Sequence, residues 1–397
     1  MDTLLSHPRI AAARAHLERT DQVTLERQAV LSAVPAPTGA EGLRATRVAE
    51  LFREVGLASV KIDAAGNVLG WLAGTGKQQT DNACPVVLAA HLDTVFGPEV
   101  DVAVQRRGAR LEGPGISDNA RGLAALVAVA EACVRGRVEP QRPMLFAATV
   151  GEEGAGDLRG VKHLVPSLPR LFAFIALDGA GVERIVHRAL GSKRYRATYR
   201  GPGGHSWAAF GVANPAIAVG RAATLTGELS VPAEPRTTCA VVRLGGGTGL
   251  NSIPQEAWLD LDLRSEDPLA LAELDGRVRA ALSRAKDKEN RRRTPGTPPL
   301  QLEVQLLGDR PSGLTPRTHP LVQAALAATR AIGKEGELAA ASTDANVPIA
   351  LGIPAIALGA GGRAGDAHLT TEWYENDGGV TGVIRALLVA AAVAGVA

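Results

Sequence analysis

The sequence predicts an α/β protein with a smaller α+β unit inserted into its chain. Three observations carry this prediction. In the first half of the 397 residues, short continuous apolar runs alternate with helix-like periodicity, as in a sheet whose two faces are both covered. From about residue 193 the pattern changes to strands that alternate polar and apolar residues. After the turn-rich segment 309–316 the first pattern resumes.

The large unit opens with helix signals over residues 9–33 and 40–56. Its buried strands are predicted over three apolar runs, Pro85–Ala90, Met144–Val150 and Phe172–Leu177. A helix between the first two strands begins near Ser117, a good N-cap, and ends at Gly136. Strands that alternate with helices in this way predict a sheet of parallel strands.

The inserted unit is predicted to follow the order β-α-β-β-α-β of the ferredoxin-like motif. Its first strand, Lys193–Arg200, alternates in polarity and is therefore half solvated. The remaining elements follow in order: a helix over 214–227, strands at Thr237–Leu244 and Ala257–Arg264, a helix over 267–290, and a strand at Leu300–Leu306. We therefore expect a catalytic domain formed by residues 1–190 and 310–397, and an inserted domain over 191–309.

Composition argues against several classes of function. The chain has 43 Lys and Arg against 41 Asp and Glu, and only 3% aromatic residues, so it lacks the basic surface and stacking platforms of a nucleic-acid binder. The most apolar stretch leaves only residues 386–397 uncharged, too few to span a bilayer. The N-terminus lacks the apolar run of a signal peptide, and three scattered cysteines suit a reducing compartment. We expect a cytoplasmic protein with no nucleic-acid or membrane partner.

Histidine and acidic side chains follow the three buried strands, at the point where each strand ends. His91 and Asp93 follow the first strand and lie on the same side of it, because side chains alternate along a strand. Glu152 and Glu153 follow the second strand, and Asp178 follows the third. Open α/β sheets bind ligands at the carboxyl ends of their strands. One histidine with several carboxylates and no cysteine suits a hard or borderline divalent ion.

Two further candidates lie in loops of the large unit. Asp118 stands at the mouth of a helix in the segment Gly113–Asn119, and His368 lies in the glycine-rich loop Gly359–Thr370. A second histidine is needed for a pair of ions about 3.5–4 Å apart. His368 is favoured over His7 and His16, which lie near the terminus, and over His163 and His319, which lie in polar connecting segments. Taken singly, each candidate could instead be a helix cap, a turn residue or a strand end.

Together, in this order along the chain, the motifs resemble the co-catalytic di-zinc peptidases and deacylases, a family that includes peptidase T, carboxypeptidase G, aminoacylase and acetylornithine deacetylase. The resemblance covers nearly the whole chain. It rests on the late His368 and on four motifs: His91-Leu92-Asp93-Thr94-Val95, Gly113-Pro114-Gly115-Ile116-Ser117-Asp118-Asn119, Gly151-Glu152-Glu153-Gly154 and Leu177-Asp178-Gly179. It implies a zinc-exopeptidase-like mixed sheet flanked by helices, with an inserted ferredoxin-like lid and dimerisation domain.

The resemblance also implies two divalent metal ions. Zinc is the first expectation, with cobalt or manganese as alternatives. His91 and Asp178 would bind one ion, Glu153 and His368 would bind the other, and Asp118 would bridge the two. In this assignment each of the three strand ends supplies one ligand, and each of the two loops supplies one ligand.

Further roles follow from the same resemblance. Glu152 would be the general base that takes a proton from the metal-bridging water and passes it to the leaving amine. Asp93 would hold the His91 ring in place. The family also carries a cis peptide after its bridging aspartate, so we expect one between Asp118 and Asn119.

Three residues of the inserted unit also match family positions. His205, in Gly201–Ser206, resembles a histidine that reaches the partner subunit's active site and stabilises the oxyanion. Asn251 resembles a substrate-binding asparagine, and Arg264 resembles an arginine that clamps a substrate carboxylate. Without the family, each would be read as an ordinary turn, loop or surface residue. The segment Ala341–Asn346 resembles a Thr-Asp-Ala stretch near the pocket, but lacks the glycines usual before it.

The expected function is that of a homodimeric di-zinc exopeptidase acting on short peptides. Asp178 favours a peptidase because other members with glutamate or histidine at this position are deacylases or carbamoyl-amide hydrolases. Whether the enzyme would be an aminopeptidase or a carboxypeptidase stays open. The alternative is an N-acyl amino-acid amidohydrolase on the same site. A more remote alternative, a non-catalytic binding protein on a hydrolase scaffold, is disfavoured because Glu152 and all five expected ligands are present.

Overall fold

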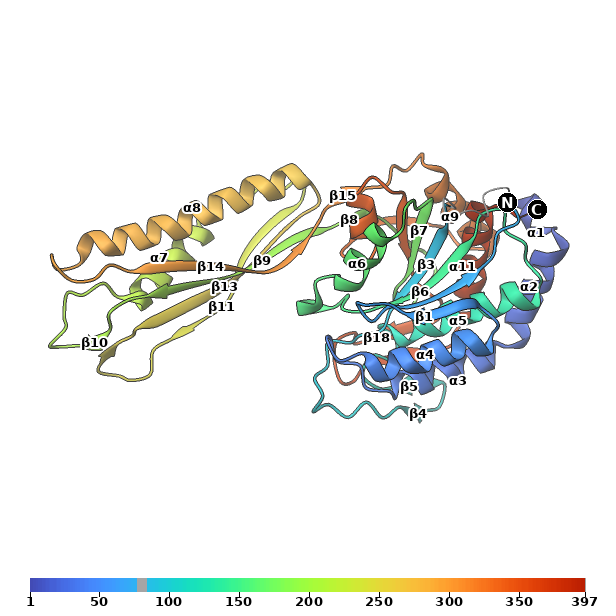
Figure 1. Cartoon of the computed structure of the whole chain (residues 1–397), viewed down its shortest axis with the longest axis horizontal. Helices are drawn as coiled ribbons and strands as arrows, with labels where there is room; N and C mark the ends of the chain where they lie inside the picture. Colours follow the sequence, from blue (N-terminus) through green and yellow to red (C-terminus); the bar gives the residue numbers. More distant parts are fainter. Residues whose placement is uncertain (77–83, 397) are drawn as a thin grey trace. The chain divides into compact units, whose positions relative to one another are not determined.

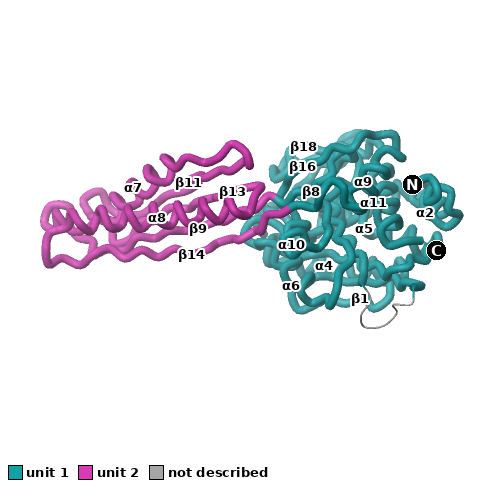
Figure 2. Tube along the Cα trace, turned by 90° about the horizontal axis from the view of Figure 1, so that it is seen from above, with its two compact units in different colours: residues 1–189, 314–397 teal, residues 190–313 magenta. Residues whose placement is uncertain are grey.

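The computed structural model describes residues 1–76 and 84–396, and the chain divides into two compact units (Figure 2). The first unit comprises Met1–Ala189 and Leu314–Ala397, and the second comprises Leu190–Gly313. Residue 397, the last of the predicted large unit, lies outside the described residues. The second unit is thus one continuous insertion in the chain of the first.

The first unit is built on a mixed β-sheet (Figure 1). Within the described residues it has nine strands in the order β1-β2-β6-β3-β7-β17-β8-β15, with β16 paired to β8. The strands are β1 (Ala58–Ile62), β2 (Val68–Leu72), β3 (Val86–His91), β6 (Met144–Thr149), β7 (Ala173–Leu177), β8 (Arg184–Ala189), β15 (Gly313–Leu314), β16 (Glu337–Ala341) and β17 (Ala355–Leu358). The predicted α/β class is confirmed.

Only part of this sheet is parallel. Strand β3 pairs in parallel with β6 and with β7, as the three apolar runs predict. Strand β2 is antiparallel to β1 and β6, and β17 is antiparallel to β8. The three strands predicted from periodicity are thus parallel to one another. Antiparallel neighbours make the whole sheet mixed, as the family resemblance implies. Only residues 63–67 join β1 to β2, too few for the crossover that a parallel pair requires.

Helices cover both faces of the sheet. Val86 and Leu88 of β3 belong to one hydrophobic cluster, whereas Val87 and Ala89 belong to another, because successive side chains of a strand point to opposite faces. The first face is covered by α1 (Asp2–Leu5), α2 (Pro8–Arg19), α3 (Asp21–Ser32), α4 (Gly42–Glu54), α5 (Ala120–Arg135), α9 (Pro320–Ala331) and α11 (Gly379–Ala394), and the second by α6 (Arg159–Ser167) and α10 (Asn346–Ala350). None of the helices in residues 1–76 and 84–396 combines the length and apolar content that crossing a membrane would need.

The N-terminal helical segment differs from the expectation of one helix over residues 9–33. It forms two helices, α2 and α3, which are separated at Thr20. The backbone of Thr20 has φ −108° and ψ 15°, outside the helical range. Its hydroxyl donates to the carbonyl oxygen of His16 at 2.8 Å, and this local bond closes the end of α2.

A small antiparallel sheet joins the two sequence segments of the first unit. Its strands lie in the order β18-β19-β5-β4, and they are β4 (Gln105–Arg107), β5 (Arg110–Glu112), β18 (Arg363–Gly365) and β19 (Trp373–Glu375). Trp373 pairs with Glu112 in this sheet. The pairing brings the chain that leads into Gly113–Asn119 beside the chain that follows His368.

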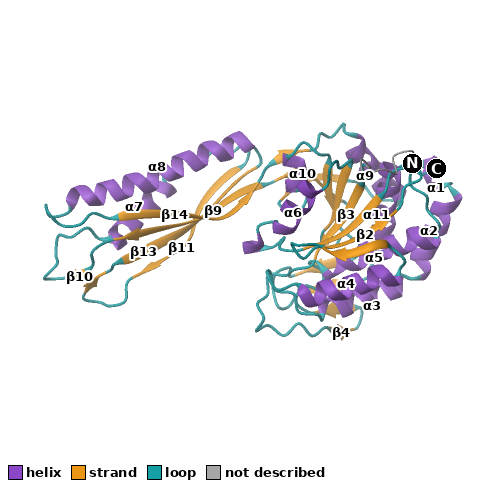
Figure 3. Cartoon of the chain, in the orientation of Figure 1, coloured by secondary structure: helices purple, strands orange, loops and turns teal. Residues whose placement is uncertain are grey.

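The second unit has the predicted order β-α-β-β-α-β (Figure 3). Its main elements are β9 (Gly191–Arg200), α7 (Pro215–Gly227), β11 (Thr237–Gly246), β13 (Glu256–Ser265), α8 (Pro268–Arg292) and β14 (Gln301–Arg310), and a hairpin of β10 (Gly204–His205) and β12 (Ser252–Ile253) is added. The strand order β11-β13-β9-β14, antiparallel throughout, is ferredoxin-like. Tyr195, Ala197 and Tyr199 of β9 lie in the core beneath the helices.

Candidate metal centre and active site

The three buried strands place their terminal residues at one edge of the sheet. His91 is the last residue of β3, Glu152 and Glu153 follow β6, and Asp178 follows β7. Because β3 pairs in parallel with both neighbours, these carboxyl ends meet. His91, Glu152 and Glu153 are buried, so the polar groups gather at a largely enclosed edge of the core.

Asp118 reaches this edge from the loop before α5. The peptide bond between Asp118 and Asn119 is cis, which confirms the prediction. Asn119, not Ser117, is the N-cap of α5, and its Oδ1 accepts the N–H of Gly122 at 3.1 Å. The Asn119 amide also donates to the carbonyl oxygen of Leu177 at 2.9 Å. The same side chain therefore ties the Asp118 loop to the end of β7.

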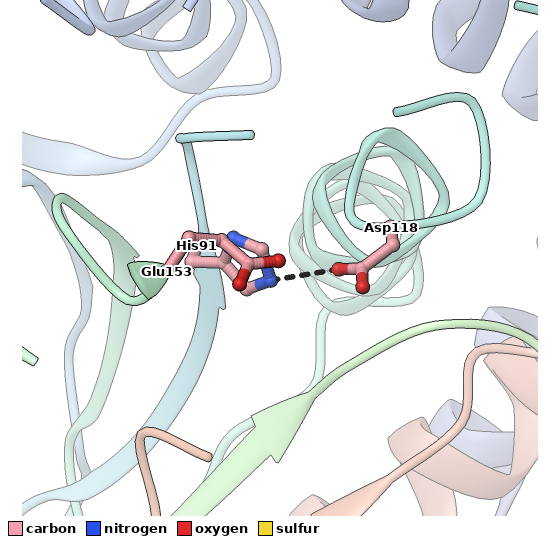
Figure 4. A group of neighbouring side chains, drawn as sticks. All are labelled: His91, Asp118 and Glu153. Carbon is pink, nitrogen blue, oxygen red and sulfur yellow. Dashed lines mark hydrogen bonds and ion pairs between the residues drawn. The ribbon is translucent and has the colours of Figure 1, made fainter. Parts of the chain in front are cut away.

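His368 comes from the loop between β18 and β19 and faces Asp118. Its Nε2 lies 3.1 Å from Oδ2 of Asp118 and 3.0 Å from Oε1 of Glu153. The other carboxylate oxygen of Asp118 lies 3.0 Å from Nε2 of His91 (Figure 4). That nitrogen is also 4.0 Å from Oδ1 of Asp178. Asp118 thus stands between two imidazoles and offers one oxygen to each.

The electrostatics of the cluster favour a bound cation. Burial, together with the charge of Asp118, raises the pKa of Asp178 to about 7. Hydrogen bonds to Asp118 and Glu153 raise the pKa of His368 to about 10. Burial by itself lowers the pKa of His91, but its hydrogen bonds to Asp118 and Asp93 outweigh this effect and hold the pKa well above its usual range. Protons on the imidazoles therefore balance the carboxylates in the metal-free protein.

These donors fit one or more divalent metal ions. Ligand atoms of His91, Asp118 and Glu153 all lie within 4.8 Å of one another (Figure 4). Imidazole nitrogen and carboxylate oxygen suit zinc, and they also suit cobalt and manganese. A cation in this position would replace the protons that the two imidazoles carry.

Metal binding is therefore expected to release protons. Zinc requires neutral imidazole, whereas His368 stays protonated up to a pKa of about 10. Zinc affinity should accordingly rise as the pH increases towards 10. Binding at neutral pH should release the protons of both imidazoles and the fraction of a proton on Asp178, about two to three protons per chain in all. Calorimetric zinc titration in buffers of different ionisation enthalpy measures this number. His368→Gln should release about one proton fewer, and an unchanged number would contradict the assignment.

Asp93 contacts His91 and the turn that carries Glu152 and Glu153. Its Oδ1 accepts the N–H of Glu152 at 2.9 Å, and its Oδ2 accepts the N–H of Glu153 at 3.0 Å. The hydroxyl of Thr38 donates to Oδ2 at 2.8 Å. Nδ1 of His91 is 3.0 Å from the main-chain oxygen of Asp93 and 3.6 Å from its carboxylate. The carboxylate that was expected to hold the His91 ring therefore makes its shorter contacts to the turn of Glu152 and Glu153.

Two buried acids near the cluster were not among the predicted site residues. Glu372 is fully buried and accepts main-chain N–H groups of the Asp118 loop. Burial raises the pKa of Glu372 to about 7. Asp344 accepts the hydroxyl of Thr149 at 2.5 Å, and its charge also raises the pKa of Asp178. In the sequence, Glu372 lies in the segment Thr370-Thr371-Glu372-Trp373, whose polar residues do not predict a buried acid. Its position four residues after His368 was the only signal that it lies near the site.

The remaining predicted residues lie in the second unit. His205 in β10 and Asn251 just before β12 belong to one exposed hairpin region, where the main-chain oxygen of Asn251 accepts the N–H of Ser206 at 2.8 Å. Nδ1 of His205 accepts the N–H of Trp207 at 3.2 Å. Arg264 lies on β13, where its guanidinium contacts Asp262 at 2.9 Å. The structure thus brings His205 and Asn251 together and holds Arg264 in an ion pair.

Comparison with known proteins was made for the family, for curated sequences and for solved structures. Residues 87–392, more than half of the chain, match the family described as Peptidase family M20/M25/M40. A comparison with curated proteins found no match.

Several solved structures share the fold. A tripeptidase from Staphylococcus aureus is 21% identical, with a TM-score of 0.76, and the match covers 94% of this chain and 98% of that one. Aminopeptidase PepT from Bacillus cereus is also 21% identical, with a TM-score of 0.73 and coverage of 93% and 99%. The YXEP protein of Bacillus subtilis, described as a dinuclear metal binding peptidase, is 15% identical, with a TM-score of 0.67 and coverage of 95% and 98%. At these identities the likeness establishes the shared fold.

Proposed function

The chain belongs to peptidase family M20/M25/M40 and is a metallopeptidase, and on that premise we propose that it is a di-zinc exopeptidase of short peptides. The observation that carries the proposal is the position of Asp118, whose two oxygens face His91 at 3.0 Å and His368 at 3.1 Å. A carboxylate placed in this way can serve two ions at once. Glu153 beside His368, and Asp178 beside His91, complete the two halves of the donor set.

The proposed ligand sets follow this division. His91 and Asp178 would hold one ion, Glu153 and His368 the other, and Asp118 both. When bound, two zinc ions supply Lewis-acid activation of water and polarise the scissile carbonyl group. Cobalt or manganese could fill the same donors.

Glu152 is the proposed general base. It is buried beside Glu153 in the turn after β6, and its N–H is held by Asp93 at 2.9 Å. A carboxylate in this enclosed, negatively charged edge has two uses in hydrolysis: it accepts a proton from the attacking water and then donates it to the leaving amine. Because Asp93 fixes the main chain at Glu152, it also limits the directions in which the Glu152 side chain can point.

The second unit is proposed to supply substrate contacts and the dimer interface. His205 and Asn251 are exposed in one hairpin region, where they can meet a molecule that approaches this unit. By family resemblance, the His205 of the partner subunit would stabilise the oxyanion, Asn251 would bind substrate, and Arg264 would take the substrate carboxylate in exchange for Asp262. The three cysteines are free, which supports the proposed cytoplasmic location.

The proposal is tested by metal content and substrate range together. About two zinc ions per chain are expected, with cleavage of di- and tripeptides that stops on chelation and returns with zinc. The position of the cleaved bond would identify the enzyme as an aminopeptidase or a carboxypeptidase. Two ions with hydrolysis of N-acylated amino acids alone would favour the amidohydrolase instead. No bound metal, and no activity after zinc, cobalt or manganese is added, would overturn the proposal.

A further inference from the structure

We propose that Glu372 is a positioning residue that fixes the loop carrying Asp118 in the metal centre. The inference rests on the proposed function, because it assigns Glu372 a role towards the same ions. Glu372 immediately precedes β19 of the small sheet and is fully buried. It does not reach the metal donors itself; it acts on them through the main chain.

The carboxylate of Glu372 accepts three main-chain N–H groups of one short loop. Its Oε1 accepts those of Ser117 and Asp118, each at 2.8 Å, and its Oε2 accepts that of Gly115 at 3.0 Å. The main-chain oxygen of Glu372 also accepts the N–H of Gly113 at 2.9 Å. Four contacts from one residue therefore set the path of the chain from Gly113 to Asp118.

The loop held in this way carries the residue that faces both imidazoles. Glu372 binds the amide of Asp118 itself, so the carboxylate holds this residue directly at its main chain. Glu372 also lies four residues after His368, whose Nε2 contacts Oδ2 of Asp118. The side chain thus ties together two loops that are 250 residues apart in the sequence and supply two of the proposed ligands.

The bonding of Glu372 differs from that of an ordinary buried acid. Among the described residues, none of the salt bridges of the structure involves Glu372, and its carboxylate is matched by amide N–H groups alone. Burying a carboxylate without a cation is costly unless its oxygens are hydrogen-bonded. The small sheet already pairs Trp373 with Glu112, so joining the two segments does not by itself require this acid. The carboxylate instead fixes the main-chain conformation of residues 115–118.

The test compares Glu372→Gln and Glu372→Ala with a control three residues later, Glu375→Gln. Glu375 is half-buried, and its carboxylate contacts Arg110 at 2.6 Å and Arg363 at 3.9 Å, outside the Asp118 loop. The Gln variant keeps an oxygen for the Ser117 and Asp118 amides but presents NH₂ to the N–H of Gly115. The Ala variant loses all three bonds. Zinc affinity is measured by chelator competition. The ligand geometry of the cobalt-loaded proteins is followed by visible absorption, and the stability of the metal-free proteins is measured by thermal denaturation.

Zinc affinity is expected to fall about tenfold in Glu372→Gln and about a hundredfold in Glu372→Ala, within the range for residues that orient metal ligands. The cobalt spectrum should shift in both variants, and kcat should fall with little change in KM. Glu375→Gln loses the charge that pairs with Arg110 and Arg363, but it should match the parent in zinc affinity, cobalt spectrum and kcat. Because Gln has nearly the size of Glu, this variant keeps the test decisive even if Glu372→Ala does not fold.

Two results would overturn the inference while leaving the proposed function intact. One is parent-like zinc affinity and an unchanged cobalt spectrum in Glu372→Gln. The other is a loss of stability in the metal-free variants with the cobalt spectrum of the loaded proteins unchanged, which would reveal a purely structural residue. A parent protein that binds no zinc and cleaves no peptide would overturn the proposed function, and the role of Glu372 with it.

Discussion

Replacing Glu152 by glutamine is expected to lower kcat about a thousandfold while both metal ions stay bound, within the range for loss of a general base. Glutamine keeps the size of the side chain but cannot accept a proton from water at neutral pH. The main chain of the turn should not move, because the N–H groups of residues 152 and 153 are held by Asp93 and not by the side chain of Glu152. Steady-state kinetics on a dipeptide, with metal analysis of the same preparation, measures both effects.

A matched control lies in the same segment. Asp157, whose carboxylate pairs with Lys162 at 2.5 Å, has a left-handed backbone with φ 53°, a conformation that asparagine tolerates. Asp157→Asn should therefore retain the kcat of the parent. If Glu152→Gln keeps more than about a tenth of the parent kcat, the assignment of Glu152 as the base is wrong. If the variant loses its metal instead, Glu152 acts as a ligand.

Replacing Asp118 by asparagine is expected to remove activity through loss of metal. Among residues 1–76 and 84–396, Asp118 alone contacts both imidazoles, with Oδ1 towards His91 and Oδ2 towards His368. Asparagine keeps the shape of the side chain but loses the charge, and it offers only one oxygen. We expect metal content to fall from about two ions to one or none, with kcat reduced about a thousandfold or more.

Asp178→Asn provides the comparison for this result. Asp178 lies 4.0 Å from His91 and is proposed to serve one ion, so its replacement should cost no more than that ion. Metal analysis by mass spectrometry after dialysis against a weak chelator would distinguish the two variants. Equal metal loss in both variants, or two ions retained in Asp118→Asn, would contradict the proposed bridging role of Asp118.

The ends of the buried strands show why much of this site could be predicted. His91, Glu153 and Asp178 follow continuous apolar runs, and a polar residue at the end of such a run must lie at the edge of the sheet. The parallel pairing of β3 with β6 and β7 then requires these residues to meet. Asp118 and His368 come from loops, for which periodicity carries no such signal, and their place in the site depended on the order of motifs along the chain.

The sequence could not predict the groups that hold this arrangement in place. Glu372 appears as one acid in a polar stretch, and only the folded chain shows that its carboxylate accepts N–H groups of residues 115, 117 and 118. The shorter contacts of Asp93, to the amides of the Glu152 turn and not to the His91 ring, are likewise contacts between residues distant in sequence. Hydrogen bonds to main-chain N–H groups leave no mark in the sequence, because every residue type except proline supplies the same donor.

By itself, the sequence determined the α/β class, the inserted β-α-β-β-α-β unit and the residues that gather at the edge of the large sheet. These features follow from local apolar periodicity and from motifs that a single chain displays in full. The tertiary structure alone decided which strands of the mixed sheet are antiparallel, that the first helical segment breaks at Thr20, and that Glu372 lies behind Asp118. Strand direction and long-range contacts to the main chain depend on how distant segments pack. The break at Thr20 depends instead on a hydroxyl that competes locally for a main-chain oxygen. Which of these interactions prevails is settled only when the whole chain is folded.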